Sequence, residues 1–116
     1  MSESSGVFTF PSTGYWRVEF NGLSYSANDR EYATGDIWVT PNSGTTWNIY
    51  SAGYSNINGV GGNNYYNTHH ASLIVDVTNA STFQVKFRVR ASASTSWYGG
   101  ASGNYTYAVF TRLGDT

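Results

Sequence analysis

Hydrophobic and polar residues alternate with a period of two in several short stretches of the chain. The alternation is clearest at residues 84–90, where valine and phenylalanine alternate with lysine and arginine. This pattern is typical of a β-strand with one buried and one solvated face. The same alternation predicts strands at residues 15–20 and 36–40.

Further strands are expected where β-branched and aromatic residues gather between turn-forming clusters of Gly, Pro, Asn, Asp and Ser. No stretch shows the 3.6-residue period of an amphipathic helix. The additional predicted strands are residues 7–10, 45–51, 70–77 and 105–113. Short strands separated by turns at this spacing predict an all-β fold, either a sandwich or a barrel.

The 116 residues lie within the size range of a single domain. Residues 1–6 are expected to form a flexible N-terminal segment, and residues 7–116 a single β-sandwich domain. Residues 53–64 and 92–103 are poor in charge and in large aliphatic side chains. They are therefore predicted to be long surface loops that carry specificity.

The predicted strand at residues 105–113 carries apolar side chains on both faces. Tyr105 and Tyr107 lie on one side, and Ala108 and Phe110 lie on the other. One face would pack inside a sandwich, and the other needs cover from a loop or from a second chain. Ile74 indicates, more weakly, that the predicted strand at 70–77 also has apolar side chains on both faces. Burial within a monomer is the alternative interpretation.

Composition excludes several classes of function. The chain has 6 basic and 7 acidic residues, a net charge of -1, and only 11% charged residues. The basic residues are scattered along the sequence, so no nucleic-acid-binding surface is indicated. No stretch approaches the about 20 apolar residues of a membrane span, and residues 1–6 lack a secretion signal. We expect a soluble protein without membrane insertion, held together without cysteine by its own core or by neighbouring subunits.

The sequence contains no pattern that indicates catalysis. No serine lies in a Gly-x-Ser-x-Gly elbow, and no pair of carboxylates suggests hydrolysis. His69 and His70 would point to opposite faces of a strand, so one chain cannot easily direct both at one metal ion. Asp29, Glu31 and Asp36 could supply oxygen ligands for Ca²⁺, although a solvated turn is the simpler interpretation. We therefore expect a non-enzymatic protein without a required cofactor.

Aromatic residues in and beside the predicted loops form a candidate carbohydrate site. Flat rings stack on sugar rings, while Asn, Ser, Thr and Gly provide adaptable hydrogen bonds. Trp97 and Tyr98, flanked by Ser and Gly, are the strongest candidates, and packing in the core or at an interface is the alternative for at least half of the set. The aromatic residues in or next to these loops are Trp47, Tyr50, Tyr54, Tyr65, Tyr66, Trp97 and Tyr98, and all of them except Tyr50 are taken as candidate ligand contacts.

Residues 8–20 resemble the signature of the globular head of complement-component-one-q-like proteins, which belong to the tumour-necrosis-factor-like jelly rolls. The signature is a Phe, five residues, a Gly, any residue, an aromatic, and two alternating apolar or aromatic positions. Trp16 stands where Tyr is usual, and Val18 where Phe is usual. The positions are filled by Phe8, Gly14, Trp16, Val18 and Phe20.

The resemblance implies an antiparallel jelly-roll β-sandwich that assembles as a homotrimer. The family's first strand region should precede Val7 and is missing, so either another chain completes the sheet edge or the fold is a shortened variant. Residues 105–113 resemble the family's closing strand, which contributes to the three-fold contacts. The expected trimer-interface residues are Ile74, Tyr105, Tyr107, Ala108 and Phe110.

The Phe-Thr-Phe-Pro start, the Asp-Val-Thr-Asn-Ala-Ser turn and the Phe-Thr-Arg-Leu-Gly-Asp-Thr end look most like versions of this domain in structural proteins of bacteriophages and marine viruses. There the domain is a trimeric knob on a tail fibre, head fibre or capsid surface. We therefore expect a virion surface protein, made in the host cytoplasm, whose partners are its own copies, other virion proteins and a host surface glycan. The alternatives are a monomeric carbohydrate-binding module and an assembly protein without a ligand.

Overall fold

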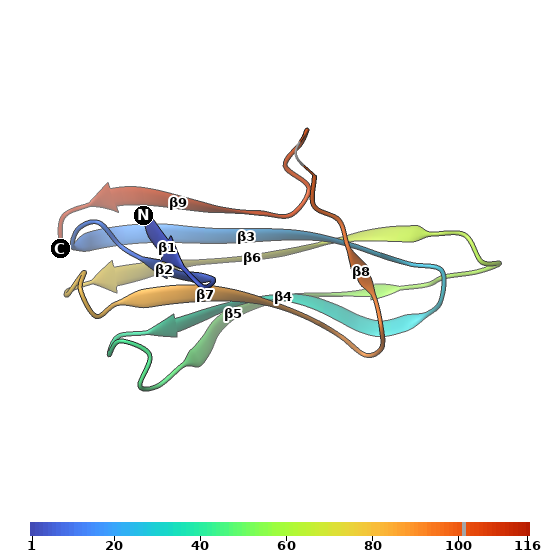
Figure 1. Cartoon of the computed structure of the whole chain (residues 1–116), viewed down its shortest axis with the longest axis horizontal. Coiled ribbons are helices and arrows are strands. Elements are labelled where there is room, and N and C mark those ends of the chain that lie inside the picture. The colour runs from blue at the N-terminus through green and yellow to red at the C-terminus, as the bar shows by residue number, and fades with distance from the viewer. Residues whose placement is uncertain (101) are drawn as a thin grey trace.

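Strands account for all the regular secondary structure in the computed structural model, which describes residues 1–100 and 102–116 (Figure 1). The described part of the chain contains no helix that is long and apolar enough to cross a membrane. The strands are β1 (Ser2–Ser4), β2 (Val7–Thr9), β3 (Gly14–Ser26), β4 (Arg30–Thr40), β5 (Asn48–Ile57), β6 (Tyr65–Val77), β7 (Gln84–Ala91), β8 (Ser96–Trp97) and β9 (Tyr107–Gly114).

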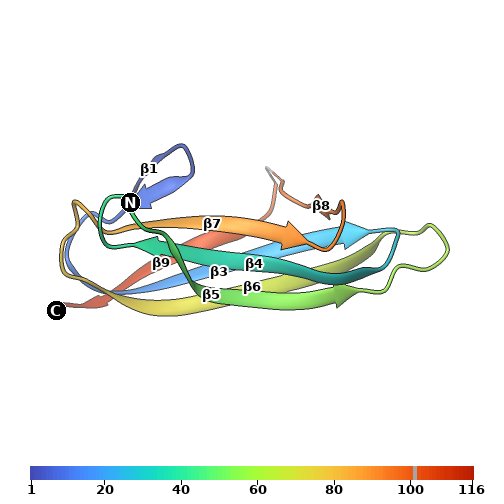
Figure 2. The same cartoon turned by 90° about the horizontal axis from the view of Figure 1, so that it is seen from below.

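The strands form two antiparallel sheets that pack face to face (Figure 2). Sheet A has the order β1-β2-β7-β4-β5. In sheet B, β3 pairs with β6 along one edge, and with β9 and β8 along successive parts of the other edge. The long strands follow the 51 Å axis of the molecule (Figure 1). The predicted antiparallel β-sandwich is confirmed, and the arrangement is consistent with a jelly roll.

The alternation of β3 explains why it forms the centre of sheet B. Trp16, Val18 and Phe20 point inward and are buried, while the residues between them face outward. Phe20 stacks on Phe87 of sheet A with ring centroids 5.1 Å apart. Phe110 of β9 faces the same core, and its ring contacts those of three phenylalanines. Burying one such side chain stabilises the fold by roughly 1.5–3 kcal/mol.

Three segments that were predicted to be flexible or to form loops contain strand residues. Ser2–Ser4, in the segment expected to be flexible, pair with β2 as strand β1. β5 extends to Ile57, which shortens the predicted loop at 53–64 to residues 58–64. The predicted loop at 92–103 contains the short strand β8, which pairs with the end of β3.

The extension of β5 has a steric cause. Gly53 lies so close to β6 that a Cβ atom there would be 2.1 Å from the backbone oxygen of His70. A glycine is therefore required where the edges of the two sheets approach each other. Its neighbours on the same face, Ser51 and Ser55, are also small. Small residues at these positions look like a loop in the sequence, whereas in the fold they allow β5 and β6 to pack closely.

One edge of sheet B is open along β9. Among the described residues, β9 pairs with β3 and with no second strand. The backbone N–H and C=O groups on its other edge are therefore available to another strand. Figure 1 shows β9 as the outermost long strand on its side of the molecule. This is an edge at which a further strand could be added.

Candidate functional site

A polar cluster centred on His69 lies inside the sandwich. His69 is 1% exposed, and its Nε2 and Nδ1 atoms lie 2.5 Å from Ser24 Oγ and 2.7 Å from Ser55 Oγ. Burial lowers the pKa of His69 below its ordinary value, so the imidazole is neutral at pH 7. Ser24 is fully buried. Its hydroxyl therefore contacts the histidine in a place that a substrate cannot reach from solvent.

The two strongest carbohydrate-site candidates lie on opposite faces of sheet B. Trp97 in β8 points inward, with its ring 5.2 Å from that of His69. Tyr98 follows it and is exposed on the outer face. Trp97 is therefore half-buried against His69, on the opposite face of the sheet from Tyr98. Tyr65 is held at the far end of β6, where its hydroxyl donates to the carbonyl oxygen of Val60 at 3.0 Å.

Four tyrosines form an aromatic cluster on the outer face of sheet B. Tyr98 packs edge to face against Tyr105 at 4.7 Å, and Tyr66 packs against Tyr25 at 5.3 Å between ring centroids. Tyr25 and Tyr66 are paired residues of β3 and β6, so they lie side by side. Of the predicted ligand aromatics, only Tyr66 and Tyr98 meet here. Exposed rings without charged neighbours suit either a neutral sugar or a protein partner.

Exposed apolar side chains continue along the same face of sheet B. Tyr107 and Val109 of β9 are 39% and 40% exposed, and Ile74 of β6 is 60% exposed. Of the predicted interface residues, Tyr105, Tyr107 and Ile74 are thus exposed on the outer face. Ala108 and Phe110 alternate with them, point inward and pack against the core of their own chain. The two-sided pattern of this strand therefore reflects one face in the core and one face that is uncovered.

The three carboxylates considered for calcium do not come together. Asp29 and Glu31 are exposed near the turn before β4, whereas Asp36 is fully buried in the middle of that strand. Among the described residues, no three His, Asp or Glu side chains gather closely enough to hold a metal ion. Asp36 instead binds Arg90 and Arg88. The calcium hypothesis is therefore not supported by this geometry.

Asp36 is charged despite its burial. Burial acts to raise the pKa of this carboxyl, but the hydrogen bonds and positive charges of Arg90 and Arg88 outweigh burial and lower the pKa. Asp36 also raises the pKa of Arg90. The group is therefore an ion pair over the whole neutral pH range.

A row of basic and aromatic side chains covers the outer face of sheet A. Lys86 and Arg88 of β7 lie over the rings of Trp47 and Trp38, each at 4.2 Å. The predicted ligand aromatics Trp47 and Tyr54 belong to this row, far from Tyr98 in the fold. The alternating basic residues of β7 were visible in the sequence as a solvated strand face. The contacts of Arg88 and Arg90 with Asp36 were not visible, because they depend on the register between β4 and β7.

Comparison with known proteins adds no family to these observations. No family model matches the chain, and no curated protein is significantly similar to it.

Proposed function

We propose that the chain is a non-enzymatic structural module, a trimeric jelly-roll knob on a bacteriophage particle that serves attachment or particle assembly. The observation that carries the proposal is the uncovered face of sheet B, where Tyr107 and Val109 are exposed beside the open edge of β9 and Ile74 is exposed on β6, on the other side of β3. The resemblance of residues 8–20 supports the trimeric arrangement and the virion setting.

The composition of this face suits a contact between subunits. Interface centres are rich in aromatic and aliphatic side chains and poor in charge. Val109 and Ile74 flank β3, on which Arg17 and Glu19 supply one charge of each sign. A standard interface buries about 800 Å² per partner, which is roughly an eighth of the 6331 Å² surface of the chain. One face of a four-stranded sheet can supply that area.

Light scattering at micromolar concentration tests the trimer. The wild-type chain should have three times the monomer mass of 12.7 kDa. Val109→Lys places a charge at the centre of the proposed contact and should yield a folded monomer, because this side chain lies outside the core. Val60→Lys is the matched control in the loop at 58–64 and should remain trimeric. A wild-type monomer, or a trimeric Val109→Lys variant, would contradict the proposal.

The virion location has its own test. Mass spectrometry of purified phage particles should detect the chain as a particle component, because a displayed knob stays with the particle. Recovery of the chain only in the soluble fraction of the lysate would contradict a virion location and leave the trimer unaffected.

A monomeric carbohydrate-binding module is the second candidate, favoured by the tyrosine cluster. Tyr66 and Tyr98 are 55% and 41% exposed and offer stacking surfaces to a neutral sugar. A glycan array on wild type and on Tyr98→Ala tests this function, since Trp97 is half-buried on the inner face of the sheet and is a poor probe. A monomer that binds a neutral glycan and loses it in Tyr98→Ala would support the module over the knob.

A further inference from the structure

Three of the six basic residues of the chain lie on one face of one strand. Lys86, Arg88 and Arg90 occupy alternate positions of β7, and all three point to the outer face of sheet A. Asp36 on the neighbouring strand β4 is the acidic group that contacts the two arginines. These four side chains, with three positive charges and one negative charge, have a net charge of +2.

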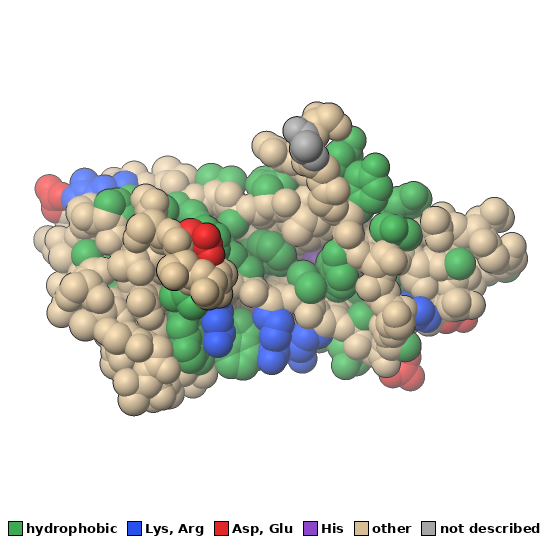
Figure 3. Space-filling view, viewed as in Figure 1, with side chains coloured by type: hydrophobic (Ala, Val, Ile, Leu, Met, Phe, Trp, Pro, Cys, Tyr) green, Lys and Arg blue, Asp and Glu red, His purple; other side chains and the backbone are tan. Residues whose placement is uncertain are grey.

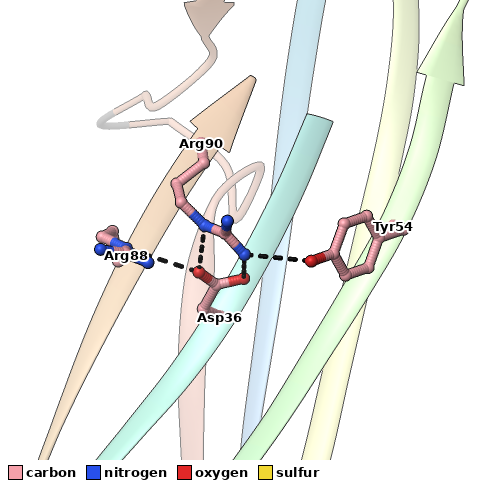
Figure 4. Close-up of polar contacts among 4 residues, drawn as sticks. All are labelled: Asp36, Tyr54, Arg88 and Arg90. Atoms are coloured by element: carbon pink, nitrogen blue, oxygen red, sulfur yellow. Dashed lines mark hydrogen bonds and ion pairs between the residues drawn. The ribbon is translucent and has the colours of Figure 1, made fainter. Parts of the chain in front are cut away.

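The buried carboxylate of Asp36 fixes both guanidinium groups (Figure 4). Arg90 donates from Nε to Oδ2 at 2.7 Å and from Nη2 to Oδ1 at 3.2 Å, and Nη2 also donates to the Tyr54 hydroxyl at 3.2 Å. Arg88 Nε lies 3.5 Å from Oδ2. Within the described residues, Nη1 of Arg90 and both Nη atoms of Arg88 have no hydrogen-bond acceptor. These N–H groups are free to bind a ligand.

Aromatic rings hold the rest of the row in position. The guanidinium of Arg88 lies 4.2 Å from the centre of the Trp38 ring, and Lys86 Nζ lies 4.2 Å from that of Trp47. Cation–π contacts of this kind restrict long side chains that would otherwise move freely. Ligand binding here costs less side-chain conformational entropy than binding to cations that move freely on the surface. Figure 3 shows lysine and arginine side chains beside hydrophobic ones on the surface of the molecule.

Stabilisation of the fold does not account for all this positive charge. The bidentate contact with Arg90 already engages both oxygens of Asp36. Arg88 approaches the same carboxylate only at 3.5 Å, its side chain is 44% exposed, and it repels the neighbouring cations. A second anion would therefore be attracted to Arg88 and Lys86.

We propose that this face binds the anionic group of an acidic saccharide, with Arg88 and Arg90 as the main donors and Lys86 as a supporting charge. Guanidinium groups bind carboxylate and sulfate oxygens through paired hydrogen bonds. Tyr54 is 63% exposed and contacts Arg90, so its ring offers a stacking surface to the sugar that carries the anion. All these groups come from one chain. Binding therefore does not need the trimer, whereas a role in attachment rests on the proposed function.

Titration calorimetry with the full chain tests the ligand class. Three oligosaccharides of equal length serve as probes: an oligogalacturonate, a heparin-derived sulfated oligosaccharide and a neutral malto-oligosaccharide. At least one acidic probe should bind, more weakly at high salt, and the comparison of the two identifies carboxylate or sulfate as the better anion. Equal binding of the neutral probe, no binding of either acidic probe, or equally strong binding of inorganic sulfate would overturn the proposal.

Substitutions locate the site. Arg88→Gln removes free guanidinium donors and leaves the Asp36–Arg90 pair intact, so the Kd should rise about tenfold. Arg112→Gln is the matched control, because that side chain is similarly exposed at 40% and pairs with Asp115 away from this face. Unchanged affinity in Arg88→Gln, or an equal loss in both variants, would overturn the proposal. Light scattering on the same samples separates the two hypotheses: a monomer that binds the acidic probe contradicts only the trimer.

Discussion

His69 is a buried polar residue whose hydrogen-bond needs are met by two serines. Neutral imidazole donates from one nitrogen and accepts at the other, and each nitrogen has a hydroxyl partner in Ser24 or Ser55. Protonation of His69 would place a positive charge in the interior, where burial disfavours the charged form of the imidazole. His69 therefore couples the stability of the fold to pH, whereas His70 on the next position is exposed.

The free energy of unfolding should fall as the pH drops below about 6.5, the ordinary pKa of histidine. The pKa of His69 is lowered in the folded state, so the unfolded chain binds the proton first and gains stability relative to the fold. The slope is at most about 1.4 kcal/mol per pH unit for one proton.

Urea unfolding between about pH 5 and 7.5 measures this dependence. His70→Gln should keep the slope, and His69→Gln should remove it while lowering stability at every pH. A slope that persists in His69→Gln would show that another group is responsible.

At the scale of elements, the close approach of β5 and β6 determines where the sandwich closes. Gly53 leaves room for the backbone of His70, and Ser55 reaches across to the His69 ring from the same strand. Both contacts join the edge strand of sheet A to the edge strand of sheet B. Small residues on this face of β5 are therefore a packing requirement.

Gly53→Ala should lower the free energy of unfolding by about 2 kcal/mol, because its Cβ would overlap backbone atoms of His70 that cannot move away as a side chain can. Thermal or urea unfolding measures the loss. Gly99→Ala is the control, since no atom lies within 4 Å of a Cβ at that position. Equal stability of the Gly53→Ala variant and wild type would contradict the close approach.

Sequence predicts the strands that carry a clear alternation and misplaces those whose residues are dictated by a neighbouring strand. The alternation at 84–90 predicted nearly the whole of β7, and the alternation at 15–20 predicted the first half of β3. β5 was predicted to end before Gly53, because small residues are typical of loops as well as of close strand contacts. The Asp36 cluster was missed for a related reason: residues 36, 88 and 90 meet only through strand register.

At the scale of the whole molecule, the two outer faces differ in chemistry. The outer face of sheet B carries exposed aromatic and aliphatic side chains beside Arg17 and Glu19, and that of sheet A combines aromatic rings with positive charge. Because the sheets lie back to back, contacts through sheet B would leave sheet A exposed in a trimer (Figure 2). Three anion-binding faces would then point outward around the three-fold axis.

A monomeric Val109→Lys chain should bind a single acidic oligosaccharide in solution as tightly as wild type does. On a surface densely coated with that oligosaccharide, the wild-type trimer should bind at least about 100-fold more tightly, because several sites engage at once. Surface plasmon resonance on dense and sparse coatings measures the difference. The same affinity for both proteins on the dense surface would contradict simultaneous binding by several chains.

The positions of the chain ends offer a practical use of the fold. Both termini lie toward one end of the 51 Å long molecule, and the loop at 58–64 lies at the opposite end (Figure 1). In that loop, Gly61 and Gly62 have open space around them. A foreign peptide inserted between these two glycines would be presented at the tip of the sandwich, so a carrier fused at either terminus could display it as a vaccine epitope or an affinity tag.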